Sequence, residues 1–386
     1  MKGVDSDRRP LKILHIDPEK GWGGGESQVL GLLGYLSRRG HRNHLLGHPE
    51  GPLLREARGS GVEAFPLTVR NDIDFRPVFS LKRLIRKERY DIVHFHTKRA
   101  HALSLWLGRI GPGIRYVVTR RMDYPVKKSW YNDYLYNRRV DGVVAISRKI
   151  VDLLVEGGVR SERIRLIHSG IDPAPFGKGD ASTADAAPTV IGTVAVLEER
   201  KGHRFLLEAA ALLKQQGHRL KYRLAGEGSE RRRLRQLVLE KGLQEEVEFA
   251  GFVSDIPAFL SAIDIFALPS LYEGLGVAVL EAMAAGKAVV ATRAGGLPEL
   301  VDDTITGVLV PQQDSRALAR AIETLIRQKA LVRQMGARGR ERVLRHFTME
   351  QMAKKNEDYY YELLQAHAGQ GWSKTGEEGS RIGIQK

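Results

Sequence analysis

The chain has no cysteine among its 386 residues, which excludes disulfides and metal sites built on thiolates. It also has no run of about 18 apolar residues, so no membrane-spanning helix is predicted. The segment Met1–Pro10 is polar and lacks the apolar core of a signal peptide. These absences favour a cytoplasmic protein, and the length is sufficient for two domains with separate cores.

Acidic residues are scarce in the first half of the chain. Met1–Lys178 contains 33 Lys and Arg against 19 Asp and Glu, whereas the remainder contains 28 against 27. The first half therefore carries +14 of the formal net charge of +15. A basic background shared by the whole proteome would not explain this asymmetry. It predicts an anionic partner for the first half, such as an acidic membrane surface, an anionic glycolipid or nucleic acid.

Part of the basic excess lies in Phe75–Arg89, which has the pattern of an amphipathic helix. We expect its apolar face to pack on the protein itself, while its charges stay available to anionic lipid. The apolar face comprises Val78, Leu81, Leu84 and Ile85, and the charges are Arg76, Lys82, Arg83, Arg86, Lys87 and Arg89. The nearby Asp72-Ile73-Asp74 is a D-x-D sequence, which we interpret as a polar loop and not as a manganese site.

The first half begins with a buried strand, Leu11–Ile16, a glycine loop, Gly21–Gly25, and a helix, Glu26–Arg39. This order lets a phosphate approach backbone amides, although the G-x-G-x-x-G dinucleotide fingerprint is not met. Further short apolar runs alternate with helical patterns. The first half is therefore predicted to be a doubly wound α/β domain with a mostly parallel sheet. The runs are Asn43–Gly47, Val62–Leu67, Asp91–His96, Tyr116–Thr119, Gly142–Ile146 and Ile164–His168.

Polar residues close two of these predicted strands, where ligands bind in open α/β sheets. His94 and His96 end one strand. We expect them to alternate between the two faces of the sheet, and so not to share a metal ion, with one of them facing the cleft. Arg120, Arg121 and Asp123 end the other strand and are candidates for the acceptor side. Arginine binds a carboxylate or phosphate through its fork of N–H groups, which suggests an anionic acceptor or donor.

The segment Asp172–Pro188 is rich in Pro, Gly, Ala, Asp and Ser and is predicted to link two domains. A second strand–loop–helix unit follows, with the loop Glu198–Gly202. Farther on, the strand Ile263–Leu268 ends at a proline, and a turn leads into a helix. The Gly274–Gly276 amides then lie at the helix N-terminus, which is a site for an anion.

Two carboxylates bracket this turn: Glu273 lies just before the helix, and Glu281 lies on it. A carboxylate beside a phosphate site is unfavourable unless it binds something else, such as sugar or ribose hydroxyls. The plain alternative is that Glu273 caps the helix and Glu281 is solvated.

The pattern E-G-x-G-x-x-x-L-E-A-M-A from residue 273, followed by G-x-x-V-V-A-T and G-G-x-P-E, resembles the nucleotide-sugar site of retaining GT-B glycosyltransferases of family 4. The resemblance implies that Glu281 binds the ribose, that Glu273 binds the transferred sugar, and that no metal or cofactor is needed. Catalytic candidates are Glu273, Lys201, Arg200 and His96. Donor-binding candidates are Glu281, Gly274, Leu275, Gly276, Gly23, Gly24, Gly25, Phe252 and Val253.

The chain departs from the family pattern in three places. Ile167–Asp172 resembles the family's I-P-N-G-V-D, with His168 in place of the proline. Val196 stands where the family has an arginine that grips the diphosphate, and Arg200 is the candidate to replace it. Arg120 and Arg121 stand where some members have a histidine.

The resemblance implies two Rossmann-like domains of the GT-B fold facing a cleft. We expect an acceptor-side domain over residues 1–172, a linker over 173–188 and a donor domain over 189–348. A helix over 349–366 would cross back to the first domain, before a disordered tail over 367–386. The implied activity transfers a sugar from a nucleotide diphosphate sugar to a hydroxyl with retention, in lipopolysaccharide or other cell-envelope glycan synthesis. The partners would be the nucleotide sugar, a glycan or glycolipid acceptor and an anionic membrane surface on the cytoplasmic side.

Three alternatives stay open. A nucleotide-sugar 2-epimerase or a phosphorylase would share the fold, but would need extra carboxylates in the cleft or a cofactor lysine. A basic nucleic-acid-binding protein would account for the charge but not for the donor motif.

Overall fold

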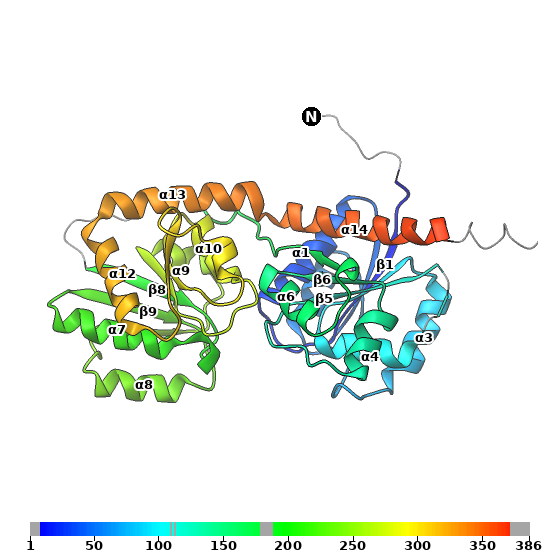
Figure 1. The fold of residues 1–386 in the computed structure, drawn as a ribbon, viewed down its shortest axis with the longest axis horizontal. Helices are drawn as coiled ribbons and strands as arrows, with labels where there is room; N and C mark the ends of the chain where they lie inside the picture. The colour runs from blue at the N-terminus through cyan, green and yellow to red at the C-terminus, as the bar shows by residue number, and fades with distance from the viewer. Residues whose placement is uncertain (1–7, 109, 112, 178–187, 371–386) are drawn as a thin grey trace, which may run out of the picture.

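The computed structural model describes residues 8–108, 110–111, 113–177 and 188–370, and it contains two parallel sheets side by side (Figure 1). The first sheet has the order β3-β2-β1-β4-β5-β6-β7 and the second β10-β9-β8-β11-β12-β13. All strand pairs in both sheets are parallel. This confirms the predicted GT-B-like arrangement of two doubly wound α/β units.

The strands of the first sheet are β1 (Lys12–Asp17), β2 (Arg42–Gly47), β3 (Glu63–Pro66), β4 (Ile92–Phe95), β5 (Arg115–Arg120), β6 (Gly142–Ala145) and β7 (Ile164–Leu166). Those of the second are β8 (Thr189–Val194), β9 (Leu220–Ala225), β10 (Val247–Gly251), β11 (Ile265–Leu268), β12 (Ala288–Thr292) and β13 (Gly307–Val310). β4, β11 and β12 are buried along their whole length. Helices cover both faces of such strands, which is why they read as continuous apolar runs.

Helices connect the strands in each half. In the first half they are α1 (Gly24–Arg38), α2 (Pro52–Gly59), α3 (Pro77–Glu88), α4 (Lys98–Leu107), α5 (Trp130–Asp133) and α6 (Arg148–Glu156). In the second half they are α7 (His203–Gln215), α8 (Arg231–Glu240), α9 (Ile256–Ser261), α10 (Val277–Ala284), α11 (Leu297–Leu300), α12 (Ser315–Arg327) and α13 (Lys329–His346).

The last helix, α14 (Met349–Gln370), follows α13 across the top of both halves in Figure 1. Ile171 pairs with Thr348 where the chain crosses between the halves. α14 then packs against α1 and buries Tyr359 and Tyr360 beside the first sheet. The domain boundaries stay a prediction; residues 178–187 of the linker and 371–386 of the tail lie outside the described residues.

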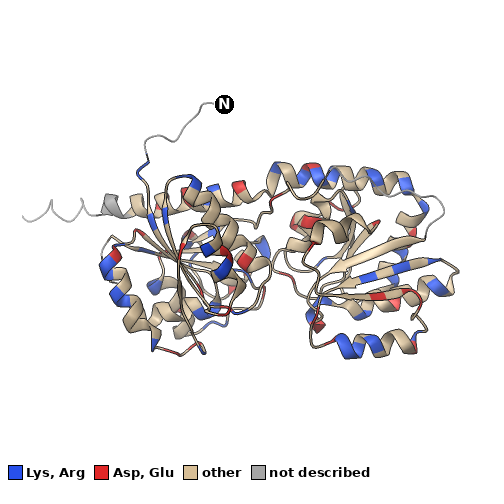
Figure 2. Cartoon of the chain, turned by 180° about the vertical axis from the view of Figure 1, so that it is seen from behind, with Lys and Arg blue, Asp and Glu red and all other residues tan. Residues whose placement is uncertain are grey.

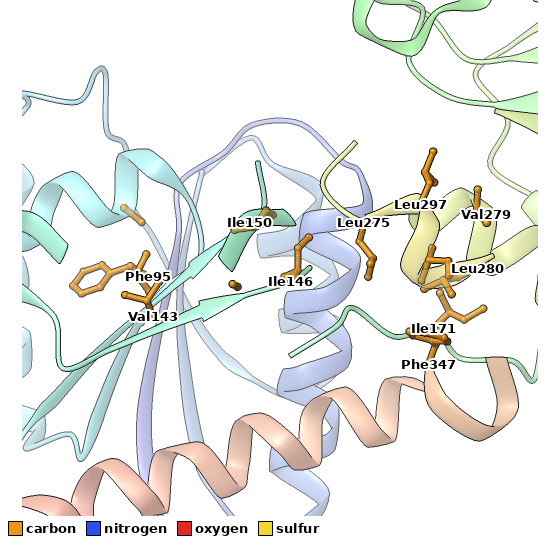
Figure 3. Packing of buried hydrophobic residues seen from close by; sticks show 14 of the residues in the cluster. Phe95, Val143, Ile146, Ile150, Ile171, Leu275, Val279, Leu280, Leu297 and Phe347 are labelled. Atoms are coloured by element: carbon orange, nitrogen blue, oxygen red, sulfur yellow. The ribbon is translucent and has the colours of Figure 1, made fainter. Parts of the chain in front are cut away.

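Apolar side chains also connect the two halves directly. One continuous cluster of buried residues includes Phe95 and Ile146 from the first half and Leu275 and Leu297 from the second. In Figure 3, Ile146 and Leu275 lie opposite each other at the junction. A loop of the predicted donor site is therefore anchored in the core that the two halves share.

Helix α3 packs as expected, with Val78, Leu81 and Ile85 buried in the first-half core. Its basic side chains lie on the outer side of the domain, where Figure 2 shows several Lys and Arg along the helix. Within the described part of the chain, no helix is both long enough and apolar enough to cross a membrane.

Candidate active site

The turn before α10 leaves a row of backbone amides free. Gly276 precedes the helix with φ 104°, a left-handed conformation that favours glycine. Among the described residues, no protein group accepts a hydrogen bond from the amides of residues 274–278. Because α10 follows the carboxyl end of β11, the dipole of the helix and these N–H groups form an anion site at the edge of the second sheet.

Lys201 and Glu273 form an ion pair beside this turn. Lys201 Nζ lies 2.5 Å from Glu273 Oε2, and Ser270 Oγ donates to the same oxygen at 3.2 Å. Both charged side chains are nearly buried, at 12% and 11% exposed. Gly202 permits this approach, because a Cβ on it would stand 2.0 Å from the Pro269 carbonyl oxygen. The 3-10 turn Glu199–Lys201 is thereby held against the donor loop.

Glu281 has a different environment from Glu273. Its carboxylate accepts no hydrogen bond from any residue in the described segments. Burial raises the pKa of Glu281 to about 7, since desolvation disfavours the charged form. Glu281 is half-buried, and its carboxyl has no partner among the described residues, so it is available for ligand hydroxyls. This placement differs from the solvated glutamate that we kept as the plain alternative.

The catalytic candidate Arg200 and the donor candidates Phe252 and Val253 are at least partly exposed. The Arg200 guanidinium pairs with Glu198, with 2.6 Å between Nε and Oε2, and its carbonyl oxygen accepts from the amides of Leu271 and Tyr272. The carboxylate of Glu198 therefore partly neutralises the charge of Arg200. Phe252, which follows β10, is 71% exposed, and Val253 is half-buried. An exposed aromatic ring at a strand end is free to stack on a base.

The glycine loop of the first half faces the donor loop. Gly23 caps the N-terminus of α1, and a Cβ on Gly24 would stand 3.2 Å from Val277, the first residue of α10. A Cβ on Gly274 would stand 2.1 Å from the Arg121 carbonyl oxygen. The loop of Gly23, Gly24 and Gly25 and the turn of Gly274, Leu275 and Gly276 therefore lie on opposite sides of one seam.

The acceptor-side candidates have distinct contacts. Asp123 Oδ2 accepts a hydrogen bond from the Glu273 amide at 2.8 Å and so joins the two halves. Arg120 donates to the carbonyl oxygens of Met122 and Tyr124, which stabilises its own loop. The guanidinium of Arg121 lies near Gly25 and has no such partner among the described residues.

A further contact between the halves was not predicted. Glu299, the last residue of the G-G-x-P-E pattern, accepts from the Arg148 amide at the N-terminus of α6. Its carboxylate also lies 2.8 Å from His168 Nε2. The only sequence signals were the family pattern itself and the substitution of His168 for the family's proline.

The expectation for His94 and His96 is wrong. Residues two apart on a strand project from the same face, and their ring centroids are 4.0 Å apart. With His15 they form a cluster in which one nitrogen from each ring lies within 4.8 Å of those of the other two. Hydrogen bonds to one another and to Asn43, Thr119 and Tyr360 use five of the six ring nitrogens. Burial lowers the pKa of His15 to about 4 and those of His94 and His96 well below the usual range, so the rings are neutral.

As a member of this cluster, His96 is buried within the first half of the chain. It stacks on His15 and is 2% exposed. The D-x-D residues likewise have local partners: Asp72 pairs with Lys98, and Asp74 with Arg76. The Arg76 hydrogen bond lowers the pKa of Asp74 to about 2.

The region around the turn before α10 therefore combines free amides with a lysine, a carboxylate paired with that lysine and a second carboxyl without a partner among the described residues. The matches to known families cover the same two halves. Residues 22–175 match the family Glycosyltransferase Family 4, and residues 180–342 match Glycosyl transferases group 1.

Many curated relatives and solved structures are similar to the chain. WcaL of Escherichia coli, named for colanic acid biosynthesis, is 39% identical over 48% of this chain, which spans 47% of WcaL. LpsE of Rhizobium meliloti, a lipopolysaccharide core biosynthesis glycosyltransferase, is 28% identical over 92% of this chain and 99% of its own. HepE of Anabaena, solved with UDP-glucose, superposes with a TM-score of 0.77 at 22% identity, over 92% of this chain and 100% of its own.

EpsD of Bacillus subtilis, named as a glycosyltransferase, is 30% identical over 80% of this chain and 86% of its own length. With both family matches, this similarity spans both sheets and the seam between them. The chain therefore belongs to the group 1, family 4 glycosyltransferases.

Proposed function

We propose that this glycosyltransferase moves a sugar from a UDP-sugar to an acceptor hydroxyl, with retention, in the assembly of a cell-envelope polysaccharide. The observation that carries the proposal is the row of free amides at residues 274–278 next to Lys201, Glu273 and Glu281. The names of WcaL and LpsE support the envelope role, and the UDP-glucose bound by HepE supports the uridine nucleotide.

The leaving diphosphate would be the centre of the chemistry. Lys201 and the α10 amides are fixed positive groups where negative charge develops as the sugar–phosphate bond breaks. Glu281 would bind the ribose hydroxyls, and Glu273 would orient a hydroxyl of the transferred sugar.

Retention follows if the acceptor oxygen attacks on the face that the diphosphate leaves. The bond from the anomeric carbon to the phosphate oxygen breaks, and a bond to the acceptor oxygen forms. The acceptor proton passes to the departing phosphate. Glu273 is held by Lys201, and Asp123 by the Glu273 amide, so both are engaged by other groups and neither is placed as a free nucleophile. This supports the front-face reaction.

The proposal predicts nucleotide binding without a metal ion. We expect UDP and UDP-sugars to raise the unfolding temperature in buffer that contains EDTA, because fixed protein charge neutralises the diphosphate. The measurement is a thermal-shift panel of UDP-, GDP- and ADP-sugars with EDTA or with manganese. Stabilisation that requires manganese would contradict the proposal that the nucleotide binds without a metal ion. Asp72 and Asp74 would then be the candidate metal ligands. A lack of stabilisation by every nucleotide would overturn the donor site.

We further propose that the acceptor is met at an anionic membrane surface, through α3 and its surroundings. Exposed apolar side chains accompany the basic residues there: Phe79 is 72% and Ile73 74% exposed. Phe75 and Trp106 are also exposed, and their ring centroids lie 6.2 Å apart. Large apolar side chains among cations suit the interface of an anionic bilayer.

Reversing four charges on α3 tests the surface. Substituting Lys82, Arg83, Arg86 and Lys87 by Glu should weaken co-sedimentation of the full chain with anionic vesicles by at least about tenfold at low salt, since each cation near such a surface contributes about 1 kcal/mol. UDP binding should not change.

The matched control makes the same change in net charge on the other half, at Arg231, Arg232, Arg233 and Arg235 of α8. It should retain vesicle binding. Equal loss in both variants would assign the attraction to net charge alone, and failure of the wild-type protein to bind anionic vesicles would remove the membrane from the proposal.

A further inference from the structure

Arg121 lies between the two glycine loops of the seam. It follows β5 directly, its carbonyl oxygen packs against Gly274, and a Cβ on Gly25 would stand 3.5 Å from its Cδ. Its side chain therefore starts at the boundary between the halves, on the side of the first half.

The guanidinium of Arg121 has no partner among the residues that the structure describes. Within the described segments it makes no ion pair and no hydrogen bond, and Nε is buried. Burial lowers the pKa of Arg121, but its usual value is so high that the group stays charged. Arg121 is half-buried, and a charged guanidinium whose N–H groups have no acceptor in the described protein is suited to bind an anionic group of a ligand.

Two acidic residues are near enough to influence Arg121 without contacting it. Asp17 and Glu26 favour its charged form. Burial, followed by the charge of Glu26, raises the pKa of Asp17 to about 7, so Asp17 is only partly ionised at neutral pH. The negative charges of Asp17 and Glu26 stabilise the positive charge of Arg121 at a distance, but neither carboxylate accepts a hydrogen bond from its N–H groups.

The buried side of Arg121 has no room for a sugar group. Arg121 lines a cavity of about 10 Å³ together with His96, Ser169 and Asn356. Each of these three has a buried polar atom without a partner in the described protein. Such a volume suits a single water molecule. Nε is the only nitrogen of Arg121 that is buried without a partner, so the terminal nitrogens are the ones open to a larger anion.

Arg121 approaches the seam from the first half, opposite the groups that we assign to the diphosphate. Lys201 and the α10 amides belong to the second half, whereas Arg121 lies two residues before Asp123, which holds the amide of Glu273. Glu273 is the residue that we assign to the transferred sugar. We propose that Arg121 binds a carboxylate on that sugar, so that the donor is a UDP-linked uronic acid. This inference rests on the proposed function.

Calorimetric titration of the full chain with UDP, UDP-glucose and UDP-glucuronic acid tests the assignment. We expect the wild-type protein to bind UDP-glucuronic acid more tightly than UDP-glucose. Arg121→Gln should weaken UDP-glucuronic acid by about 10- to 100-fold, as expected for hydrogen bonds to a charged group, and change UDP by less than about threefold. Arg121→Lys, which keeps the charge without the fork, should recover part of the loss. Arg160→Gln, an exposed arginine of the same half, is the matched control.

The other outcomes show whether Arg121 pairs with a sugar carboxylate, with the diphosphate or with the acidic residues of the protein. Equal weakening of UDP and UDP-glucuronic acid by Arg121→Gln would assign Arg121 to the diphosphate and overturn the inference. Unchanged affinities would show that Asp17 and Glu26 suffice as partners, with the same consequence. If the wild-type protein prefers UDP-glucose, the inference fails while the proposed function stands. If it binds none of the three, both fail. Unfolding temperatures of the variants distinguish lost contacts from lost folding.

Discussion

Lys201→Ala should lower kcat by about 30- to 1000-fold, which corresponds to about 2–4 kcal/mol of lost transition-state stabilisation, by analogy with the removal of one oxyanion donor. The reason is the position of the ammonium group beside the free amides that precede α10. It is a fixed charge where the diphosphate leaves, and Gly202 holds its loop close to the donor turn. The measurement is the transfer rate with the donor identified by the thermal-shift panel.

The loss of Lys201 also leaves Glu273 buried without its counter-ion, so stability must be measured separately. Breaking a buried ion pair costs about 3–5 kcal/mol of folding free energy. The double variant Lys201→Ala with Glu273→Gln removes that unpaired charge and should regain stability without regaining activity. Arg204→Ala, the loss of an exposed cation on the adjacent α7, is the control for net charge. If Lys201→Ala keeps kcat within twofold of the wild type, Lys201 is not part of the site.

Glu281 and Glu273 should have separable effects on ligand binding. Glu281 has no partner in the described segments, so Glu281→Gln should weaken UDP and UDP-glucose alike, by about 10- to 100-fold, through loss of the charged hydrogen bonds to the ribose. Glu273→Gln should weaken only the sugar-bearing form.

A pH dependence follows from Glu281. Its pKa is raised to about 7, and ribose hydroxyls donate to its ionised form. UDP affinity should therefore rise from pH 6 to pH 8 in the wild-type protein. Glu281→Gln should flatten that dependence.

The donor loop could be predicted because its signals are local. A strand that ends at Pro269, glycines at 274 and 276 and apolar residues at helical spacing place the free amides and Glu281 within a dozen residues of one another. The prediction of doubly wound, mostly parallel sheets follows from the alternation of apolar runs with helical patterns, whereas the order of the strands was not predicted. Short-range periodicity carries that information.

The contacts that close the seam could not be predicted in the same way. Asp123 is 150 residues from the Glu273 amide that it binds, and Glu299 is 151 residues from Arg148. No periodicity joins such residues. From its position after a strand, Asp123 was predicted to lie on the acceptor side. Only the packing of the two halves shows that its carboxylate accepts a hydrogen bond from the Glu273 amide.

The histidines show an error of a different kind. Strand periodicity places His94 and His96 on one face, and His15 joins them because β1 and β4 are adjacent, with His15 opposite His94 in register. Correct use of the two-residue period would have predicted the pair, although not the third histidine. The exposed Phe79 was also not predicted, because periodicity identifies an apolar side chain but not the absence of a neighbour to cover it.

Calorimetric titration of UDP and UDP-glucose into the wild-type protein, Glu281→Gln and Glu273→Gln tests the central claim most directly, that the nucleotide sugar is held at the N-terminus of α10. We predict that the wild-type protein binds both ligands, that Glu281→Gln loses affinity for both, and that Glu273→Gln loses affinity for UDP-glucose alone. Wild-type protein that binds neither ligand, or UDP binding that is the same in all three proteins, would contradict the claim.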